Sequence, residues 1–346
     1  MAIPYIGQLM RRELVWAGII GISFGLIIAF GAWRISSTKR TSPGSSATPL
    51  PSPTTSEFKI TLDKPENNDV VTENSITVSG ITKPLAWITV SGDKGDYIIQ
   101  SDEHGGFTQD VDLSSGVNQI KVTGFDPKGG QAIQKVLIVY SSSFEVLAVP
   151  TPLPGDNSTE SAIRAKVQQK VAEALNKPKA YLGVVTDIAD ATIQLKTADS
   201  EIKQVSTDSR TPTVVNIKGT NNKAVKLTDI AIGDFIVAMG YLNSSSVLSA
   251  QRILITDPVT ESKIDSFYGK VSDTSTKLIT VENLKDGKTS TVTPGTKTIV
   301  ETYNQGQFLP SKIAGINSGD VLIYVLDSNP DTPTIRSIFV VQKPSV

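Results

Sequence analysis

The second half of the chain contains two copies of one sequence pattern, and this duplication limits the folds open to it. Residues 182–185 (LGVV) match residues 268–271 (YGKV), and Arg252-Ile253 matches Ser337-Ile338 near the end of each copy. The offset between the copies is about 86 positions. That period is too long for a solenoid, in which repeats of 20–50 residues stack on one another. The duplication therefore predicts two small domains in tandem.

Each copy is expected to fold as a small β-barrel, the first over 180–257 and the second over 266–343. Five or six short strands in about 75 residues cannot form two good sheets, so closure into a barrel is the economical solution. A Gly-Asp pair precedes the last hairpin of each copy, where glycine takes a turn dihedral barred to other residues and aspartate bonds back to turn amides. The residues with this structural role are Gly233, Asp234, Gly319 and Asp320.

The two copies resemble uncharacterised β-barrel modules, OB-like in outline, that are often found in tandem in bacterial envelope proteins. That family has no agreed activity to carry over. Barrels that bind single-stranded nucleic acid need stacking aromatic side chains beside basic ones. Aromatic residues make up only 6% of this chain, and its formal net charge is -1. No nucleic-acid partner is therefore expected.

Residues 57–141 contain short β-rich runs separated by turn clusters, a pattern typical of a β-sandwich. Hydrophobic alternation is clear at Ile76/Val78 and Ile88/Val90. The run LDKPENNDVVTENSITVSGITKP, followed by ITVSG, by Gly106-Phe107 and by Gly116-Val117-Asn118, resembles the bacterial Ig-like domains of envelope proteins and secreted glycosidases. The glucodextranase-type module is the nearest of these. The resemblance implies an Ig-like sandwich that serves as a spacer or adhesive module without catalysis.

Residues 14–33 form a continuous apolar run without a charge. About twenty helical residues span about 30 Å, the thickness of the hydrocarbon core of a bilayer. Trp16 and Trp33 lie near the two ends, where indole rings prefer the headgroup region. The run predicts a transmembrane helix over 14–35 that contacts membrane lipid. The alternative is a cleaved signal peptide, which normally has a shorter apolar core.

The orientation of this segment is not decided by its flanking charges, because two basic residues precede it and three follow it. Long C-terminal domains translocate largely regardless of such charges. We therefore expect a cytoplasmic N-terminus over 1–13, a single-pass anchor in the cell membrane, and extracytoplasmic C-terminal domains. Small residues recur every fourth position in the apolar run, which suits helix-mediated self-association, although glycine is also common in membrane helices generally. These packing candidates are Ala17, Gly21, Gly25 and Ala29.

Two further segments connect these parts. Residues 36–56 are rich in Ser, Thr and Pro, cannot bury enough apolar surface to fold, and predict an extended stalk. Residues 142–179 predict a linker with one amphipathic helix, because Ile163, Val167 and Val171 recur at four-residue intervals. That helix would pack on the next β-domain or, as an alternative, form a coiled-coil contact.

Nothing in the sequence indicates catalysis. Cysteine is absent, and His104 is the only histidine. The sequence contains no zinc-protease helix motif, no P-loop and no Rossmann glycine run. We therefore expect no enzyme, no metal and no cofactor. Clustered aspartates between 93 and 126 could instead suggest calcium, but Asp-rich turns usually satisfy their own backbone. Trp87 is a weak ligand candidate, because a carbohydrate site usually offers an aromatic platform.

The predicted fold class is mainly β: a transmembrane helix, an immunoglobulin-like sandwich, one amphipathic helix and two tandem OB-like barrels. The corresponding functional hypothesis is a membrane-anchored bacterial cell-envelope protein that presents these modules for structural or protein-interaction roles. The alternative is a surface protein that binds carbohydrate or peptidoglycan. Its partner would be an envelope protein or a cell-wall polymer.

Overall fold

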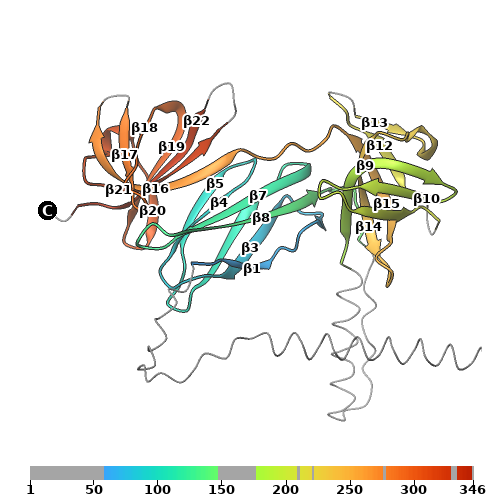
Figure 1. The fold of residues 1–346 in the computed structure, drawn as a ribbon, viewed down its shortest axis with the longest axis horizontal. Coiled ribbons are helices and arrows are strands. Elements are labelled where there is room, and N and C mark those ends of the chain that lie inside the picture. The colour runs from blue at the N-terminus through green and yellow to red at the C-terminus, as the bar shows by residue number, and fades with distance from the viewer. Residues whose placement is uncertain are drawn as a thin grey trace, which may run out of the picture. The chain divides into compact units, whose positions relative to one another are not determined.

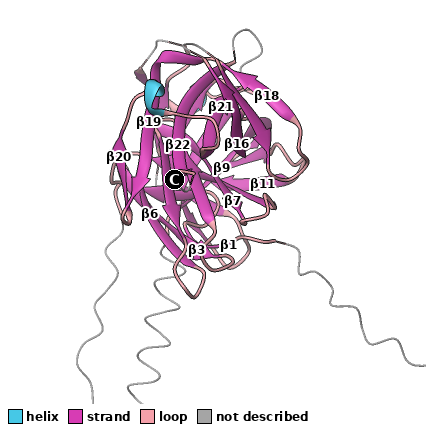
Figure 2. Cartoon of the chain, turned by 90° about the vertical axis from the view of Figure 1, so that its left-hand side faces the viewer, coloured by secondary structure: helices cyan, strands magenta, loops and turns pink. Residues whose placement is uncertain are grey.

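The computed structural model describes six stretches of the chain (Figure 1), namely residues 58–146, 177–208, 211–219, 222–275, 278–328 and 333–344. Residues Glu57–Val346 form one compact unit. In the described stretches this unit contains 22 β-strands and two short 3-10 helices. Figure 2 shows strands throughout this part of the chain.

Residues 58–146 form a β-sandwich of two sheets. One sheet has the order β1-β3-β6, and the other contains the order β2-β8-β7-β4-β5. The alternating apolar residues of the sequence face the core between the sheets, where Val78, Ile88 and Val122 are fully buried. The strands are β1 (Thr61–Lys64), β2 (Asp69–Val71), β3 (Ser75–Ile81), β4 (Trp87–Ser91), β5 (Asp96–Gln100), β6 (Gly106–Asp112), β7 (Gly116–Phe125) and β8 (Gln131–Tyr140).

The first sequence repeat forms a closed ring of paired strands. The ring runs β9-β10-β11-β15-β14 and returns to β9, with β11 and β15 parallel and the other neighbours antiparallel. The hairpin β12–β13 extends the sheet beside β15. The elements are β9 (Lys179–Ala189), β10 (Thr192–Lys196), β11 (Ile202–Ser206), β12 (Thr213–Asn216), β13 (Lys223–Val225), η1 (Leu227–Asp229), β14 (Phe235–Leu242) and β15 (Leu248–Thr256).

The second repeat has the same elements in the same order, so the tandem-repeat architecture expected from the sequence is confirmed. The strand β22 is parallel to β19. The first pair between them, Pro294 of β19 and Ile335 of β22, takes the place that the pairing of β11 with β15 has in the first repeat. The elements are β16 (Ile264–Thr274), β17 (Ile279–Asn283), β18 (Thr289–Val292), β19 (Pro294–Asn304), β20 (Gln307–Pro310), η2 (Ile313–Gly315), β21 (Val321–Asp327) and β22 (Thr334–Gln342).

A glycine at the same place in each repeat lets two strands approach closely. A Cβ on Gly183 would lie 2.4 Å from the carbonyl oxygen of Lys196, and a Cβ on Gly269 would lie 2.5 Å from that of Glu282. The pairing of β9 with β10 and that of β16 with β17 both shift register near this point. Glycine is therefore required at this position of each opening hairpin, because a side chain would collide with the backbone of the facing strand.

The helical part of the predicted fold class is wrong. In the described stretches the only helices are η1 and η2, each three residues long, and neither could cross a bilayer. The segments predicted as helices, 14–35 and part of 142–179, lie outside the described residues, as do 1–13 and the predicted stalk over 36–56. The prediction rested on apolar content and four-residue spacing, whereas helical stability comes mostly from packing, which spacing alone does not supply. The described structure is mainly β.

Candidate interaction site

Both barrels pack the same outer face against the sandwich. Six of the eight residues of β14 and four of the seven residues of the equivalent β21 are buried, because one face of each strand lines the barrel interior and the other meets the sandwich. The apolar side chains of this outer face fall in two clusters that also contain sandwich residues. In the first barrel they are Leu182, Phe235, Val237, Met239 and Leu254, and the equivalent residues of the second are Tyr268, Val321, Ile323, Val325 and Phe339.

The junction with the first barrel combines backbone pairing with ion pairs. Asp69 of β2 pairs with Lys179 of β9, and the Ala180 amide donates to the Asn68 carbonyl at 2.8 Å. The Asp69 side chain is only 5% exposed, and its oxygens lie 2.7 and 2.8 Å from the Nζ atoms of Lys179 and Lys177. Such burial is tolerable because two ammonium groups compensate the carboxylate.

The junction with the second barrel includes polar contacts between distant parts of the chain. The Oγ1 of Thr89 lies 2.9 Å from the Oγ of Ser266, and both side chains are buried. The Lys121 ammonium donates to the Ile264 carbonyl at 2.8 Å and to the carboxylate of Asp265. These bonds link β4 and β7 of the sandwich to β16 of the barrel.

A groove of about 460 Å³ lies at the edge of this second junction. Its volume falls in the range of small-ligand sites. One wall is the turn between β4 and β5 in the sandwich, and the other is formed by β19 and β22 of the second barrel. The lining residues of the sandwich are Lys94, Gly95 and Asp96, and the barrel adds Gly295, Thr296, Lys297, Thr298, Ile299, Thr334, Ile335, Arg336 and Ser337.

A β-bulge aims Arg336 at the sandwich. In the pairing of β21 with β22, Val325 faces Ser337 and Leu326 faces Ile335, so Arg336 between them has no opposite residue. A bulge of this kind bends the strand and redirects the side chain of the extra residue. The first barrel has the same irregularity, because Met239 faces Arg252 and Gly240 faces Ala250.

Arg336 forms the charged contact that joins the two walls. Its Nε donates to Oδ2 of Asp96 at 3.2 Å, and its Nη2 donates to the Gly92 carbonyl at 2.7 Å. The Oγ of Ser337 donates to the same Asp96 oxygen at 2.8 Å. The Asp96 side chain is only 2% exposed. Burial raises the pKa of neighbouring Asp93, and the charge of Arg336 opposes that shift.

The barrel wall of the groove is open because β19 separates from β22 for part of its length. The strands pair at Pro294, diverge, and pair again from Ile299. In the gap, Thr298 Oγ1 donates to the Ile335 carbonyl at 2.7 Å and accepts from the Gly295 amide at 2.8 Å. A side-chain hydroxyl thus replaces the missing backbone partner, and the lost pairing leaves room for the groove.

The charge of its lining suits the groove to binding an anion. Its lining holds three cations, Lys94, Lys297 and Arg336, against one carboxylate, Asp96. Among the described residues neither lysine has an ion-pair partner. The lining contains no histidine, and no group of His, Asp or Glu that could hold a metal occurs in the described part of the chain.

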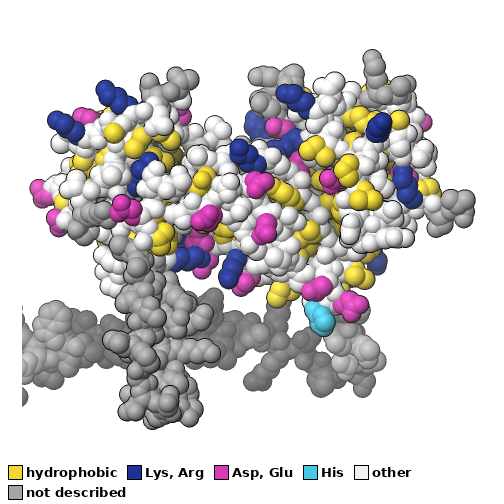
Figure 3. Space-filling model, turned by 180° about the vertical axis from the view of Figure 1, so that it is seen from behind, with side chains coloured by type: hydrophobic (Ala, Val, Ile, Leu, Met, Phe, Trp, Pro, Cys, Tyr) yellow, Lys and Arg dark blue, Asp and Glu magenta, His cyan; other side chains and the backbone are white. Residues whose placement is uncertain are grey.

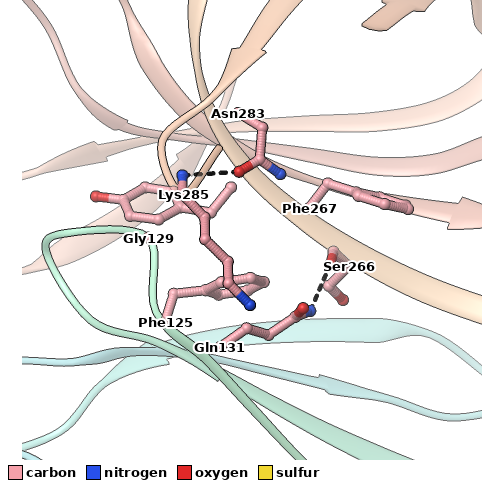
Figure 4. A pocket seen from close by; sticks show the side chains of 8 residues that line it. Phe125, Gly129, Gln131, Ser266, Phe267, Asn283 and Lys285 are labelled. Carbon is pink, nitrogen blue, oxygen red and sulfur yellow. Dashed lines mark hydrogen bonds between the residues drawn. The ribbon is translucent and has the colours of Figure 1, made fainter. Parts of the chain in front are cut away.

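A second cavity of about 20 Å³ lies inside the same junction (Figure 4), where the β7–β8 turn of the sandwich faces β16 and the β17–β18 turn. The Nε2 of Gln131 donates to the Ser266 carbonyl at 3.1 Å, and the Lys285 amide donates to Oδ1 of Asn283 at 2.8 Å. The space is that of roughly one water molecule. It is a packing gap between modules and too small for a ligand.

The structure places Trp87 inside the second junction. Its ring meets Tyr303 edge-on at 5.1 Å between centroids and Phe308 at 5.8 Å. Edge-to-face arrangements of this kind stabilise packed aromatic clusters. Because barrel side chains contact the ring, Trp87 is not a free platform for a sugar.

The structure places each Gly-Asp pair in the turn before the last hairpin of its barrel. Gly233 and Gly319 have φ of +94° and +92°, a conformation that side-chain-bearing residues rarely adopt. Asp234 accepts a hydrogen bond at 2.9 Å from the amide three residues earlier, and Asp320 accepts the equivalent bond at 2.8 Å. Each turn also bonds back to the first strand of its barrel.

The two aspartates differ in burial and in the source of their ammonium partner. Asp234 is 19% exposed and pairs with Lys218 at 2.6 Å, and the hydrogen bond from Lys218 is the main reason that its pKa is lowered. Asp320 is fully buried and pairs with Lys343 at 2.6 Å. The second turn therefore depends more on its charge pair.

Replacing Asp320 with alanine should consequently destabilise the protein more than replacing Asp234. The Asp320→Ala variant leaves the Asn317 amide and the half-exposed Lys343 ammonium without their acceptor and empties a buried site, at a cost of about 2–3 kcal/mol. The more exposed Asp234 should cost about 1 kcal/mol. Urea unfolding of both variants measures the difference, and equal losses would contradict the role assigned to burial.

The remaining residues singled out from the sequence are not gathered into a site. Ala17, Gly21, Gly25 and Ala29 lie outside the described residues. His104 is in an exposed turn, where its amide donates to the Asp102 carboxylate at 2.8 Å. Asp126 accepts from the Lys128 and Gly130 amides in the same manner. These carboxylates are occupied by their own turns.

The residues of the groove were missed by the sequence interpretation. Asp96 and Arg336 are 240 positions apart, and no local pattern connects them. The available signal was Arg336 itself, the one charged residue of β22. On the face shown in Figure 3, side chains of both charges are interspersed, so overall charge also gave no indication of a site.

No family model matches the chain, and no curated protein matches it. Some solved structures show distant similarity. One described as drosophila Unr CSD456 shares 12% identity, with 75% of this chain and 98% of that chain covered and a TM-score of 0.16. A tetra-tandem repeat in the extending region of a large adhesion protein shares 11%, covering 82% and 72%, with a TM-score of 0.20.

A third structure concerns host cell surface retention of a 1.5-MDa bacterial ice-binding adhesin. It shares 12% identity, covers 82% of this chain and 95% of that chain, and has a TM-score of 0.18. TM-scores this low carry no argument about this protein, so its function must be inferred from its own residues.

Proposed function

We propose that this chain is a non-catalytic bacterial cell-envelope protein whose β-modules serve a structural or protein-interaction role. The observation that carries the proposal is the packing of both barrels on one sandwich through equivalent apolar faces. This arrangement builds a single multi-module unit, and its groove is lined by three cations and one carboxylate. Binding surfaces between rigidly packed modules are common sites of recognition.

We further propose that the sandwich is an Ig-like module of the bacterial envelope type. The strand β2 runs parallel to β8 in one sheet, while the preceding β1 belongs to the other sheet. The first strand of the domain is thus divided between the sheets. This strand order supports the resemblance noted in the sequence between residues 57 and 141.

We propose that the apolar segment over 14–33 attaches the protein to the cell membrane, with the β-modules outside the cytoplasm. Aspartate near the centre of a membrane segment costs about 3 kcal/mol per residue. The double variant Ile22→Asp, Leu26→Asp should therefore move most of the protein from the carbonate-washed membrane fraction to the supernatant. Immunoblotting of the two fractions measures the change.

The matched control is Ile22→Leu, Leu26→Ile, which keeps the segment apolar and should stay with the membrane. The orientation is tested by adding a protease to intact cells expressing the unaltered protein. External cleavage of the β-modules supports the proposal. If the β-modules are cleaved only after the cells are lysed, or if carbonate releases the unaltered protein from the membrane, the proposed envelope location is wrong.

A carbohydrate-binding role is the second candidate, and the groove favours it. The two roles are separable by capture experiments with full-length protein in detergent. Retention on a purified glycan in the absence of other proteins supports the carbohydrate role. Recovery of a specific envelope protein by crosslinking in cells, without glycan retention, supports the protein-interaction role.

A further inference from the structure

We infer that the groove between the sandwich and the second barrel binds an acidic polysaccharide, a hydroxyl-rich chain with repeated anionic groups. The inference rests on the binding role proposed above and names the ligand class of that site. It is carried by the charge, the hydroxyl content and the two-walled construction of the groove.

The lining of the groove carries a net positive charge, which favours an anionic ligand. The single carboxylate, Asp96, is already neutralised by Arg336 and holds a hydrogen bond from Ser337. Lys94 and Lys297 remain, and neither forms an ion pair with another described residue. Both residues are exposed. Two unpaired ammonium groups in one groove favour an anionic ligand. Their attraction for that ligand weakens as salt is added.

The two lysines come from different modules. Lys94 is in the turn between β4 and β5 of the sandwich, and Lys297 is in the divergent part of β19 in the second barrel. A ligand that contacts both must lie across the junction. An extended polymer with repeated charges meets this requirement better than one small anion, because successive groups can reach each wall.

The rest of the lining suits hydroxyl groups rather than rings or bases. Thr296 and Thr334 provide hydroxyls, and divergence of β19 exposes backbone around Gly295. No aromatic side chain lines the groove, so the base stacking that single-stranded nucleic acids require is missing. Hydrogen bonds to hydroxyls together with two positive charges match an acidic glycan.

The test is binding of the full-length protein in detergent to two immobilised acidic polysaccharides: polygalacturonate, which carries carboxylates, and phosphomannan, which carries phosphates. We expect binding to at least one polymer that weakens at least fivefold between 50 and 300 mM salt, estimated as about two released counterion contacts. The Lys94→Glu, Lys297→Glu variant should lose at least tenfold in affinity, an estimate of about 1.4 kcal/mol.

The matched control is Lys128→Glu, Lys270→Glu, which changes the net charge equally through one exposed lysine of the sandwich and one of the second barrel. Neither residue lines the groove. The control should bind like the unaltered protein. An equal loss in both double variants would show that overall charge governs binding and would overturn the site.

Two further outcomes would also overturn the inference. Absence of binding to both acidic polymers would remove the ligand class, and equal binding to neutral galactan would remove the role of charge. Binding to polyglutamate as tight as to the polysaccharides would point to an acidic peptide instead. None of these results touches the cellular location, which the fractionation and protease experiments test separately.

Discussion

Replacing Arg336 with methionine should lower the free energy of unfolding by about 3 kcal/mol, the lower end of the cost of removing one partner from a buried ion pair. The Asp96 carboxylate is 2% exposed and would retain only the hydroxyl of Ser337. The Gly92 carbonyl would also lose its donor. Methionine keeps much of the aliphatic volume, so the loss reports the charge contact. Urea unfolding followed by circular dichroism measures it.

Two variants separate this contact from a general effect of charge. In the double variant Arg336→Met, Asp96→Asn, the buried group is neutral, so at least half of the lost stability should return. Lys270→Met removes an exposed cation from the same barrel and should change stability by less than about 0.5 kcal/mol. If the double variant is as unstable as Arg336→Met, the buried carboxylate is not the cause.

The second large effect is expected at the apolar junction. Phe339 is 1% exposed on the outer face of β22, in the cluster shared with the sandwich residues Ile98 and Phe125. The Phe339→Ala variant should cost about 3–5 kcal/mol, the range for truncating a buried phenylalanine. It should also loosen the second barrel from the sandwich, so trypsin should cleave the connecting segment at exposed Lys263 faster than in the unaltered protein.

The neighbouring residue Ile338 provides the matched control. It is also 1% exposed, but it faces the interior of the barrel. The Ile338→Ala variant should lose about 2–4 kcal/mol. Because its outer face is intact, cleavage at Lys263 under native conditions should remain slow. Equal acceleration in both variants would mean that the junction has no separate stability.

The duplicated pattern and the strand content were predictable because both depend on local sequence. The alternation in β3 and β4 fixes which side chains enter the sandwich core, and the Gly-Asp turns recur at the same spacing. Continuous apolar runs in β14 and β21 could also have indicated strands buried on both faces, and thus a covered outer face on each barrel.

The groove could not be predicted from the sequence, for a geometric reason. It exists because one bulge in β22 turns Arg336 outward and because β19 leaves β22 between Pro294 and Ile299. Both irregularities depend on how strands pair across the barrel rather than on the composition of either strand. The contact between Arg336 and Asp96, which joins the two walls of the groove, connects residues 240 positions apart. No sequence pattern predicts such a contact.

The shared docking face also bears on how the protein arose. Leu182, Val237 and Leu254 correspond to Tyr268, Ile323 and Phe339, so the positions agree although all of these side chains differ. The simplest explanation is that a single ancestral barrel already had this apolar outer face before its gene segment was duplicated. That ancestor already needed a neighbour to shield it. The two faces meet different surfaces of the sandwich, and their side chains differ accordingly: Tyr268 and Phe339 are larger than Leu182 and Leu254, whereas Val321 is smaller than Phe235.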